Sequence, residues 1–553
     1  MKKSLNKLGF VSIAFFTSLF CAGTFHEYIS CIVSVFLAGW LIINHTRNKK
    51  TVIYKNSALL WVTVTVVLYG LSSFWAVDPG MAFIGFIKYL PLLLFALVLM
   101  QSDECDVVLE LFPYAVGAMV VLSAILAQIP SISTYFLVGD RLSGFLQDPN
   151  TFAILLLVAE LLLLTKPRIK NVDIAFIAIL VLGLVYSTSR IVLLITLISN
   201  IIAVLYTKSK RFIFCSVLAL LAGGFISVVF LIATDNFQII ERLFTVSWKE
   251  SSFVSRFLYY KDALPTIIDN PFGTGYMGYS YMQSSFQSGI YSVSFVHNDF
   301  LQLMLDIGWI PAILFAFTVF KKIFAKKTTR AVRIILSCLA AHCFFDFDIQ
   351  FLSVCFLFLI LLDVKSGKPV EFKDRLWLTR GVTAVIAVAS IYVGTSLILY
   401  KSGHYEASYK MYPYNTDTET ALLLNSDDIE ESYRIADKMQ KRNEYAHISY
   451  SVKAQYAFGN GDYDMLIEQM NRSIEIAPLV YPQYEDYARM LIQGISDFKQ
   501  KNDIANVEKC TSELKKIPER LAALSERISY LGSLLDEQPK TALPEALIQY
   551  IPQ

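Results

Sequence analysis

Residues 82–100 read AFIGFIKYLPLLLFALVLM, and this stretch indicates the fold class because Lys88 is its only charged residue. A helix needs about 20 mostly apolar residues to cross the hydrocarbon core of a membrane, so the stretch predicts a transmembrane helix. The whole chain agrees with this, since hydrophobic residues make up 55% of its 553 residues and charged residues only 17%. Soluble proteins carry about 25% charged residues. We therefore expect most of the chain to lie in a bilayer.

Similar apolar stretches recur along the chain on both sides of this one. They predict an all-α protein whose main part is a polytopic transmembrane bundle of about 12 to 13 spans. The first stretch follows a basic N-terminus like a signal peptide, but hydrophobicity resumes at Phe25, which favours a retained first span. The predicted spans lie near residues 8–22, 27–44, 57–74, 82–100, 107–129, 150–165, 172–187, 190–206, 212–233, 299–320, 331–346, 349–363 and 380–399.

The connections between these spans form two sets that alternate along the chain. One set is rich in Lys and Arg, and it contains for example Lys166, Arg168 and Lys170. Short basic connections face the cytoplasm, so we expect the other set to lie outside; a hairpin around 342–350 that enters and leaves on one side would change the count but not the sides. An odd number of spans then places residues 401–553 outside too. The expected external connections are the turn at His26 and residues 75–80, 131–150, 187–190, 234–298 and 344–350.

Two domains are expected, a membrane domain at 1–400 with a long external loop at 234–298, and an external helical domain at 401–553. The eight cysteines are scattered without a C-x-x-C pair, and no His, Cys and Asp set has the spacing of metal ligands. A net charge of only +2 does not indicate a nucleic-acid partner, and we expect none. We also expect no metal and no cofactor.

The external domain contains a helix, a tight turn and a second helix, predicted at 446–458 and 463–476 around G-N-G-D, with Pro478 beyond. This pattern resembles one tetratricopeptide-like unit, and helices at 428–442 and 484–499 would extend the stack. Two roles stay open for the domain: a rigid cover for the external loop, or a docking surface for an acceptor or a partner protein. Farther on, apolar residues step by three and four and predict one helix face, namely Leu521, Leu524, Ile528, Leu531 and Leu535.

Arginines stand in the short external connections at Arg141, in R-L-S-G-F-L-Q-D-P-N, and at Arg190, in S-T-S-R. A guanidinium at the membrane interface is costly without an anionic partner, which marks such residues as functional candidates. The planar fork of Arg binds two phosphate oxygens at once. The alternative is that these side chains extend to lipid head groups.

The external loop at 234–298 is too long to be a simple connection, and its many Tyr and Phe residues argue against disorder. Tyrosines offer flat apolar rings with hydroxyls, which suit sugar rings or the membrane interface. His297 stands where the loop returns to the membrane. A single histidine at a helix start is more often structural than catalytic, so both interpretations stay open.

The order of these motifs resembles the O-antigen ligase and polymerase superfamily, which includes O-antigen ligases, O-antigen polymerases and bacterial O-oligosaccharyltransferases. The resemblance covers about residues 130–360. It is carried by the sequence of motifs R-L-S-G-F-x-x-D-P-N at 141–150, S-T-S-R at 187–190, R-F-x-x-Y-K-D-A at 256–263, N-P-F-G-T-G-Y at 270–276 and H-N-D-F-L-Q-L at 297–303, followed by G-W-I at 308–310.

The resemblance implies His297 as general base, Arg141 and Arg190 as clamps for the donor diphosphate, and Arg256 as a further clamp. In this family a histidine of a large external loop is regarded as catalytic, and helix-mouth arginines are thought to hold the diphosphate of a polyprenyl-linked donor. Cations suit the charge that grows on a leaving diphosphate, and His suits proton transfer at neutral pH. Supporting or sugar-binding residues are expected among Asn150, Tyr260, Lys261, Asn298, Asp299, His342 and Asp346.

The expected function is transfer of a glycan from a polyprenyl (undecaprenyl) diphosphate to a lipid, wall or glycan acceptor. The expected place is the outer face of a bacterial cytoplasmic membrane. Polymerisation of the glycan and transfer to protein Ser or Thr share the same donor chemistry and stay open beside ligation. A non-enzymatic exporter of the lipid-linked glycan is the alternative from another class. An exporter is expected to have charged residues deep within many of its spans, whereas Lys88 is one of the few charged residues within the predicted spans here.

Overall fold

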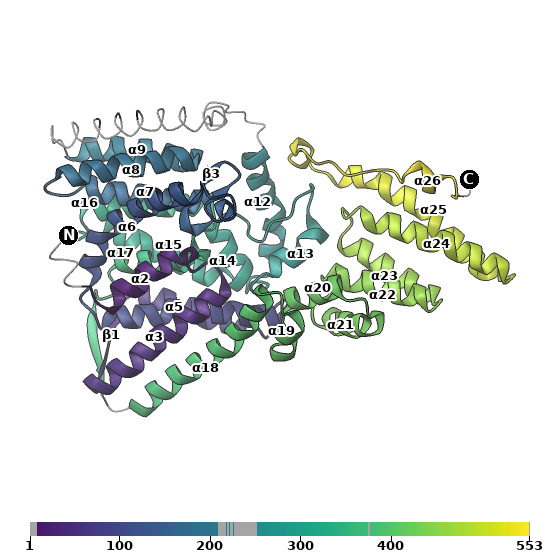
Figure 1. Ribbon diagram of the computed structural model, residues 1–553, viewed down its shortest axis with the longest axis horizontal. Coiled ribbons are helices and arrows are strands. Elements are labelled where there is room, and N and C mark those ends of the chain that lie inside the picture. The colour runs from purple at the N-terminus through teal and green to yellow at the C-terminus, as the bar shows by residue number, and fades with distance from the viewer. Residues whose placement is uncertain are drawn as a thin grey trace.

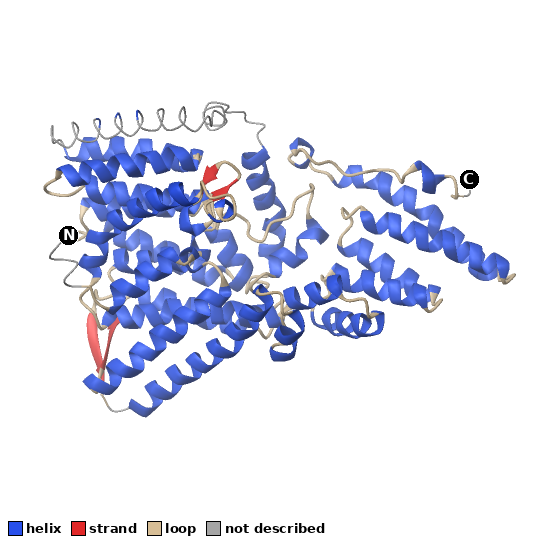
Figure 2. Cartoon of the chain, viewed as in Figure 1, coloured by secondary structure: helices blue, strands red, loops and turns tan. Residues whose placement is uncertain are grey.

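The computed structural model describes residues 8–207, 251–373 and 376–551, together with 217, 221 and 225. Within these residues the chain is helical except for two short strand pairs (Figure 2). The all-α prediction is therefore confirmed. The predicted span at 212–233 and the start of the external loop at 234–250 lie outside the described residues, apart from the three single positions.

Four helices of the described part are long and apolar enough to cross a membrane, and they are α3 (Glu27–Asn48), α5 (Pro79–Met100), α6 (Cys105–Leu126) and α18 (Leu376–Lys401). Shorter apolar helices pack with them. These are α2 (Phe10–Phe20), α4 (Ser57–Ser72), α7 (Pro149–Leu164), α8 (Asn171–Ser187), α9 (Arg190–Thr207) and α17 (Leu352–Leu362). The chain is thus a membrane protein, and the count of 12 to 13 spans stays a prediction.

The predicted span at 299–320 is two helices, α14 (Asp299–Ile307) and α15 (Trp309–Phe324), which meet at Gly308. Gly308 has φ +87°, and a side-chain carbon there would lie 2.4 Å from the carbonyl oxygen of Pro271. Only glycine fits this left-handed position so close to another backbone. The contact with the N-P-F-G-T-G segment therefore breaks the helix at Gly308, and hydropathy alone does not predict such a break.

The described part of the external loop is mostly helical, with α12 (Ser251–Asp269) and α13 (Gly278–Phe286). After α15 comes α16 (Arg330–His342), which a turn joins to α17. Short elements complete the membrane part. These are β1 (Thr51–Lys55), β4 (Lys368–Phe372), β2 (Leu137–Val138), β3 (Arg141–Leu142), η1 (Ala22–Thr24), η2 (Ser133–Tyr135), η3 (Gly144–Leu146) and η4 (Asp348–Gln350).

Contacts between the connections agree with the two predicted sets. At one end of the body β1 pairs antiparallel with β4, so two basic connections that are far apart in sequence lie side by side. At the other end the amide of Val77 donates to the carbonyl oxygen of Thr274 over 2.9 Å, which joins two expected external connections. The strand pair lies at the end of the body away from the C-terminal helices (Figure 1).

Residues after α18 form a chain of helices beside the membrane body (Figure 1). Helices occur at all four predicted positions, and Leu466, Tyr487 and Leu514 are fully buried among them. The tetratricopeptide-like assignment stays a prediction. The helices are α19 (Tyr405–Met411), α20 (Thr416–Asn425), α21 (Ile429–Arg442), α22 (His447–Gly459), α23 (Tyr463–Ile476), α24 (Pro482–Gln500), α25 (Ile504–Arg527) and α26 (Glu545–Ile548), with η5 at Gly532–Leu534.

The predicted continuous helix face through Leu535 is wrong beyond Arg527, where α25 ends. Leu521 and Leu524 are buried on α25 as expected. The chain then turns because it pairs with the external loop: the amide of Ser529 donates to the carbonyl oxygen of Ser288 over 2.9 Å. A tertiary contact therefore overrides the local apolar period.

Candidate active site

His297 is held in an unusual backbone position directly before α14. Its φ is +53°, a left-handed conformation that costs about 1 to 2 kcal/mol for a non-glycine residue. The hydroxyl of Tyr260 on α12 donates to the His297 carbonyl oxygen over 2.6 Å. Asn298 caps α14 by accepting from the amides of Phe300 and Leu301, as its short polar side chain favours. The backbone on both sides of the imidazole is therefore fixed.

Asp346, in the turn between α16 and α17, contacts both His297 and Arg256. Its Oδ1 lies 3.2 Å from Nδ1 of His297, and its Oδ2 lies 3.3 Å from a terminal guanidinium nitrogen of Arg256. The carboxylate is buried, whereas the His297 side chain is 25% exposed. A carboxylate on Nδ1 orients an imidazole and stabilises the imidazolium ion. This arrangement leaves Nε2 as the nitrogen that can accept a proton from a substrate.

Arg141 lies on β3, in a hairpin with β2. Its side chain links the start of α7 with the turn between α8 and α9. Its Nε donates to the Ser187 carbonyl oxygen over 2.9 Å and to the Thr188 hydroxyl over 3.1 Å. A terminal nitrogen donates to Oδ1 of Asn150 over 2.6 Å. Arg190 begins α9 just after Thr188. The structure thus brings Arg141, Asn150 and the S-T-S-R motif together.

Asp148 connects the Arg141 hairpin with the His297 cluster electrostatically. It caps α7 by accepting from the amides of Asn150 and Thr151. Burial, followed by the charge of Asp346, raises the pKa of the Asp148 carboxyl above its usual range, although Arg141 and His297 favour its ionised form. Asp148 therefore lies within range of the charges of both the hairpin and the His297 cluster.

Three helices begin at this end of the body, α7 at Pro149, α9 at Arg190 and α14 at Asp299. The N-terminus of a helix carries partial positive charge, which favours bound anions. At α7 and α14 two amides each already donate to Asp148 and Asn298. The site therefore combines helix N-termini, arginines and one imidazole, a set suited to an anionic group undergoing proton-assisted transfer.

The other predicted site residues take different positions. Lys261 is exposed on α12, outside this hydrogen-bonded cluster. Asp299 is buried, and its Oδ1 accepts from the amide of Ile349 over 3.0 Å. His342 is buried too, with Nδ1 2.5 Å from Oδ2 of Asp348. His342 and Asp299 therefore support the α16–α17 turn and do not contact His297 directly in the described hydrogen bonds.

Asp299, Cys343 and Asp348 are buried, and their potential ligand atoms lie within 4.8 Å of one another. Spacing along the sequence did not suggest this group. Both oxygens of Asp348 already have partners, His342 and the Thr151 hydroxyl. These contacts fit a hydrogen-bonded support beneath the turn.

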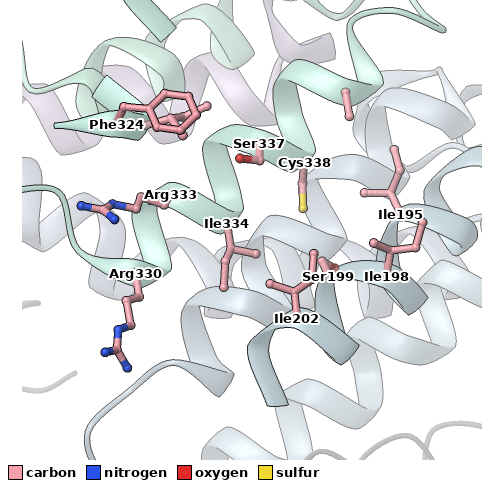
Figure 3. A pocket seen from close by; sticks show the side chains of 12 residues that line it. Ile195, Ile198, Ser199, Ile202, Phe324, Arg330, Arg333, Ile334, Ser337 and Cys338 are labelled. Atoms are coloured by element: carbon pink, nitrogen blue, oxygen red, sulfur yellow. The ribbon is translucent and has the colours of Figure 1, made fainter. Parts of the chain in front are cut away.

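An apolar pocket of about 370 Å³ runs along α16 between α9 and α15. Figure 3 shows Ile195, Ile198 and Ile202 of α9 facing Ile334 and Cys338 of α16, with the basic side chains Arg330 and Arg333 at the start of α16. The lining continues to Ala341, next to His342 at the end of α16. A lipid chain in this pocket would reach from the basic end of the body toward the His297 site.

The C-terminal helices are joined to the external loop that carries the site. Arg527 donates from Nε to the Gln287 carbonyl oxygen over 3.1 Å and also donates to that of Ser285. The neighbouring Ser288 donates its amide to Oδ2 of Asp262 on α12 over 2.8 Å. Because α12 also carries Arg256 and Tyr260, these contacts connect the C-terminal helices with the active-site side chains.

The sequence alone did not single out Asp148. Phe347 and Asp348 lie in H-C-F-F-D-F-D at 342–348, an external segment expected either to orient His297 or contact the acceptor, or to be a polar helix end. Asp148 stands inside the R-L-S-G-F-L-Q-D-P-N motif, next to a proline, where a helix cap is common. The Phe347 ring packs edge-on against the His297 ring at 4.8 Å between centroids. Which partners Phe347 and Asp348 take within that segment depends on the tertiary fold.

Residues 175–316 match the family model described as O-Antigen ligase. The matched part contains Arg190, Arg256 and His297, whereas Arg141 and Asp346 lie outside it. Neither the curated proteins nor the solved structures gave a match. The match supports glycan transfer of the ligase and polymerase type by a glycosyltransferase-like membrane enzyme. The resemblance seen in the motifs is thereby confirmed, and this chain carries a domain of the O-antigen ligase superfamily at residues 175–316.

Proposed function

We propose that this protein transfers a glycan from a polyprenyl-diphosphate donor to an acceptor hydroxyl on the outer face of a bacterial cytoplasmic membrane. The observation that carries the proposal is the contact of one buried carboxylate, Asp346, with both His297 and Arg256. It couples a base to a cation at the end of the body that bears the expected external connections. Ligation to a lipid, wall or glycan acceptor is the form of the reaction we favour.

In the proposed reaction, Nε2 of His297 takes the proton of the acceptor hydroxyl as its oxygen attacks the first carbon of the donor sugar. The bond from that carbon to the diphosphate oxygen breaks, and polyprenyl diphosphate leaves. Asp346 stabilises the imidazolium that forms. General base catalysis of this kind contributes about 10²- to 10⁴-fold.

The arginines are the proposed diphosphate clamps. The Nε–H of Arg256 is buried and has no hydrogen-bond partner among the described residues, and leaving a buried donor unpaired costs about 1 to 3 kcal/mol. A phosphate oxygen would satisfy it. Arg190 begins α9, whose N-terminus also favours an anion, and Arg141 on β3 contacts Thr188 in the turn just before that helix.

The apolar pocket along α16 is the proposed place for the prenyl chain of the donor. Its lining of isoleucines suits hydrocarbon, and it extends toward the end of α16 where the α16–α17 turn carries Asp346. A donor seated this way would place its diphosphate near the arginines. The C-terminal helices are proposed to stabilise the external loop, and a protein partner on residues 401–553 stays a prediction.

The experiment that tests the proposal supplies purified protein in vesicles with a labelled polyprenyl-diphosphate oligosaccharide and envelope acceptor fractions, followed by mass spectrometry. Glycan on a new lipid or wall carrier indicates a ligase. Longer lipid-linked chains indicate a polymerase, and glycan on Ser or Thr indicates a protein oligosaccharyltransferase. Unconsumed donor that has crossed the vesicle bilayer would indicate the exporter and contradict the proposal.

A further inference from the structure

A second cavity, of about 130 Å³, lies between the membrane body and the C-terminal helices. α3, α5 and α18 line it from the body, and α20 lines it from the C-terminal side. Figure 1 shows α18 ending beside α19 and α20. The cavity is separate from the pocket along α16, and its lining includes none of the proposed catalytic or clamp residues.

The lining combines flat rings with hydrogen-bonding groups. Tyr28 and Tyr400 contribute rings, Glu27 and Asp417 contribute carboxylates, Asn415 contributes an amide, and Leu397 lies on the apolar side. Aromatic faces pack on the C–H surface of a sugar ring, and carboxylates accept from its hydroxyls. The Asn415 side-chain oxygen caps α20 by accepting from the amides of Asp417 and Thr418, which leaves its amide nitrogen to donate to a sugar. The volume is close to that of an engineered cavity of about 150 Å³ that binds benzene, so it suits the ring of a single sugar and not a longer segment of glycan.

Buried contacts fix the C-terminal part of this lining against the body. The Thr416 hydroxyl donates to the buried carboxylate of Asp78, and the Asn443 side chain donates to the same carboxylate over 3.1 Å. Arg442 pairs with the buried Glu419 on α20. Asn415 and Asp417, on either side of Thr416, are therefore held in place by groups that solvent does not reach.

The body side is fixed as well. The Tyr276 hydroxyl donates to Oε1 of Glu27, and the fully buried ammonium of Lys88 lies 3.5 Å from the same oxygen. Lys88 is thus explained as the partner of a cavity carboxylate, not as part of a transport path. Both carboxylates of the lining are oriented before any ligand arrives, which reduces the entropic cost of binding.

The cavity lies next to the active site. Phe25, one residue before the cavity residue His26, packs against Phe347 at 6.3 Å between ring centroids, and Phe347 packs against His297 at 4.8 Å. Two aromatic rings, Phe25 and Phe347, therefore lie between the cavity residue His26 and the imidazole, a separation that neighbouring sugars of the same glycan can span.

We propose that this cavity binds one pyranose ring of a substrate glycan, so that the C-terminal domain contributes Asn415 and Asp417 to glycan recognition. The inference builds on the proposed glycan transfer. The ring belongs either to the donor glycan or to a glycan acceptor, and the two sources share the same chemistry. Kinetics distinguish them, because the Michaelis constant of only one substrate should respond to changes in the cavity.

Two variants of the full-length protein test the proposal in the glycan-transfer assay. Leu397→Trp fills the cavity from α18, and Ile398→Trp, at a position 41% exposed on the same helix, is its control. Asp417→Asn removes one acceptor of hydroxyl groups, and the exposed Asp427→Asn is its control. Both cavity variants should raise the KM of one substrate about tenfold with kcat within about twofold, and both controls should match the wild type.

A rise in donor KM assigns the ring to the donor, and a rise in acceptor KM assigns it to the acceptor. Unchanged KM for both substrates in both folded cavity variants overturns the proposal. A binding measurement separates this result from failure of the transferase proposal. Methyl α-glucopyranoside, methyl α-galactopyranoside and methyl α-mannopyranoside serve as probes in saturation-transfer NMR. At least one should give a signal with wild type and Ile398→Trp that Leu397→Trp loses, and equal signals, or none, overturn the site.

Discussion

Asp346→Asn should slow glycan transfer roughly a hundredfold while the protein still folds and inserts. The substitution keeps the size of the side chain but removes the charge that His297 and Arg256 share. The two contacts, at 3.2 and 3.3 Å, are longer than the 2.7 to 2.9 Å typical of charge-assisted bonds. We therefore take the lower limit of about 1.5 kcal/mol for each. The sum of about 3 kcal/mol corresponds to roughly a hundredfold in rate.

The assay is single-turnover transfer from a labelled polyprenyl-diphosphate oligosaccharide in proteoliposomes, with the inserted fraction measured on the same sample. The matched control is Asp173→Asn. The Asp173 carboxylate is equally buried and pairs with Lys166 over 2.9 Å, in a connection of the basic set. Wild-type turnover in the control and a hundredfold loss in Asp346→Asn are expected. If Asp346→Asn turned over within about threefold of wild type, the coupling of base and cation would be refuted.

Further predictions concern the loop, the C-terminal helices and the cavity. Gly273→Ala should destabilise the protein by about 2 kcal/mol or more in thermal unfolding, because φ is +80° and the added carbon would lie 2.5 Å from the Asp306 backbone. Arg527→Ala should lower kcat about tenfold because it removes two hydrogen bonds to the external loop. The control Arg472→Ala, at an exposed ion pair, should leave kcat unchanged, and equal kcat values for the two variants would contradict the prediction. Burial, then the charge of Glu27, raises the pKa of Asp417 to about 6, above its usual value of about 4. The folded state therefore binds this proton more tightly than the unfolded state, and the stability of the wild type should fall as pH rises between these two values. The gain in melting temperature of Asp417→Asn over wild type should therefore widen across that window and then stay constant, and a gain independent of pH would contradict it.

Much of the fold could be predicted from the sequence, because apolar length and the alternation of basic connections are local signals. The helix pair predicted at 446–458 and 463–476 is present as α22 and α23. The break at Gly308 and the end of α25 at Arg527 were missed. Both depend on contacts with distant segments, the carbonyl of Pro271 and the loop at Ser288, which no period in the sequence records.

The candidate site was predictable where residue type and motif coincide, as for His297 and Arg256. The pairing through Asp346 needed the fold, because 49 residues separate Asp346 from His297. Asp148 lies in the same motif as Arg141. An Asp directly before a Pro predicts a helix cap, and the sequence does not show that this cap lies near His297. The cavity around Asp417 could not be anticipated, because its walls come from parts of the chain far apart in sequence.

The most direct test of the central claim is transfer by His297→Ala in a single turnover with donor and acceptor both bound. The control is His404→Ala, an exposed histidine near the end of α18. We expect no glycan product from His297→Ala, with donor still bound, and full product from His404→Ala. Product formed by His297→Ala at the wild-type rate would contradict the claim that this imidazole takes the acceptor proton.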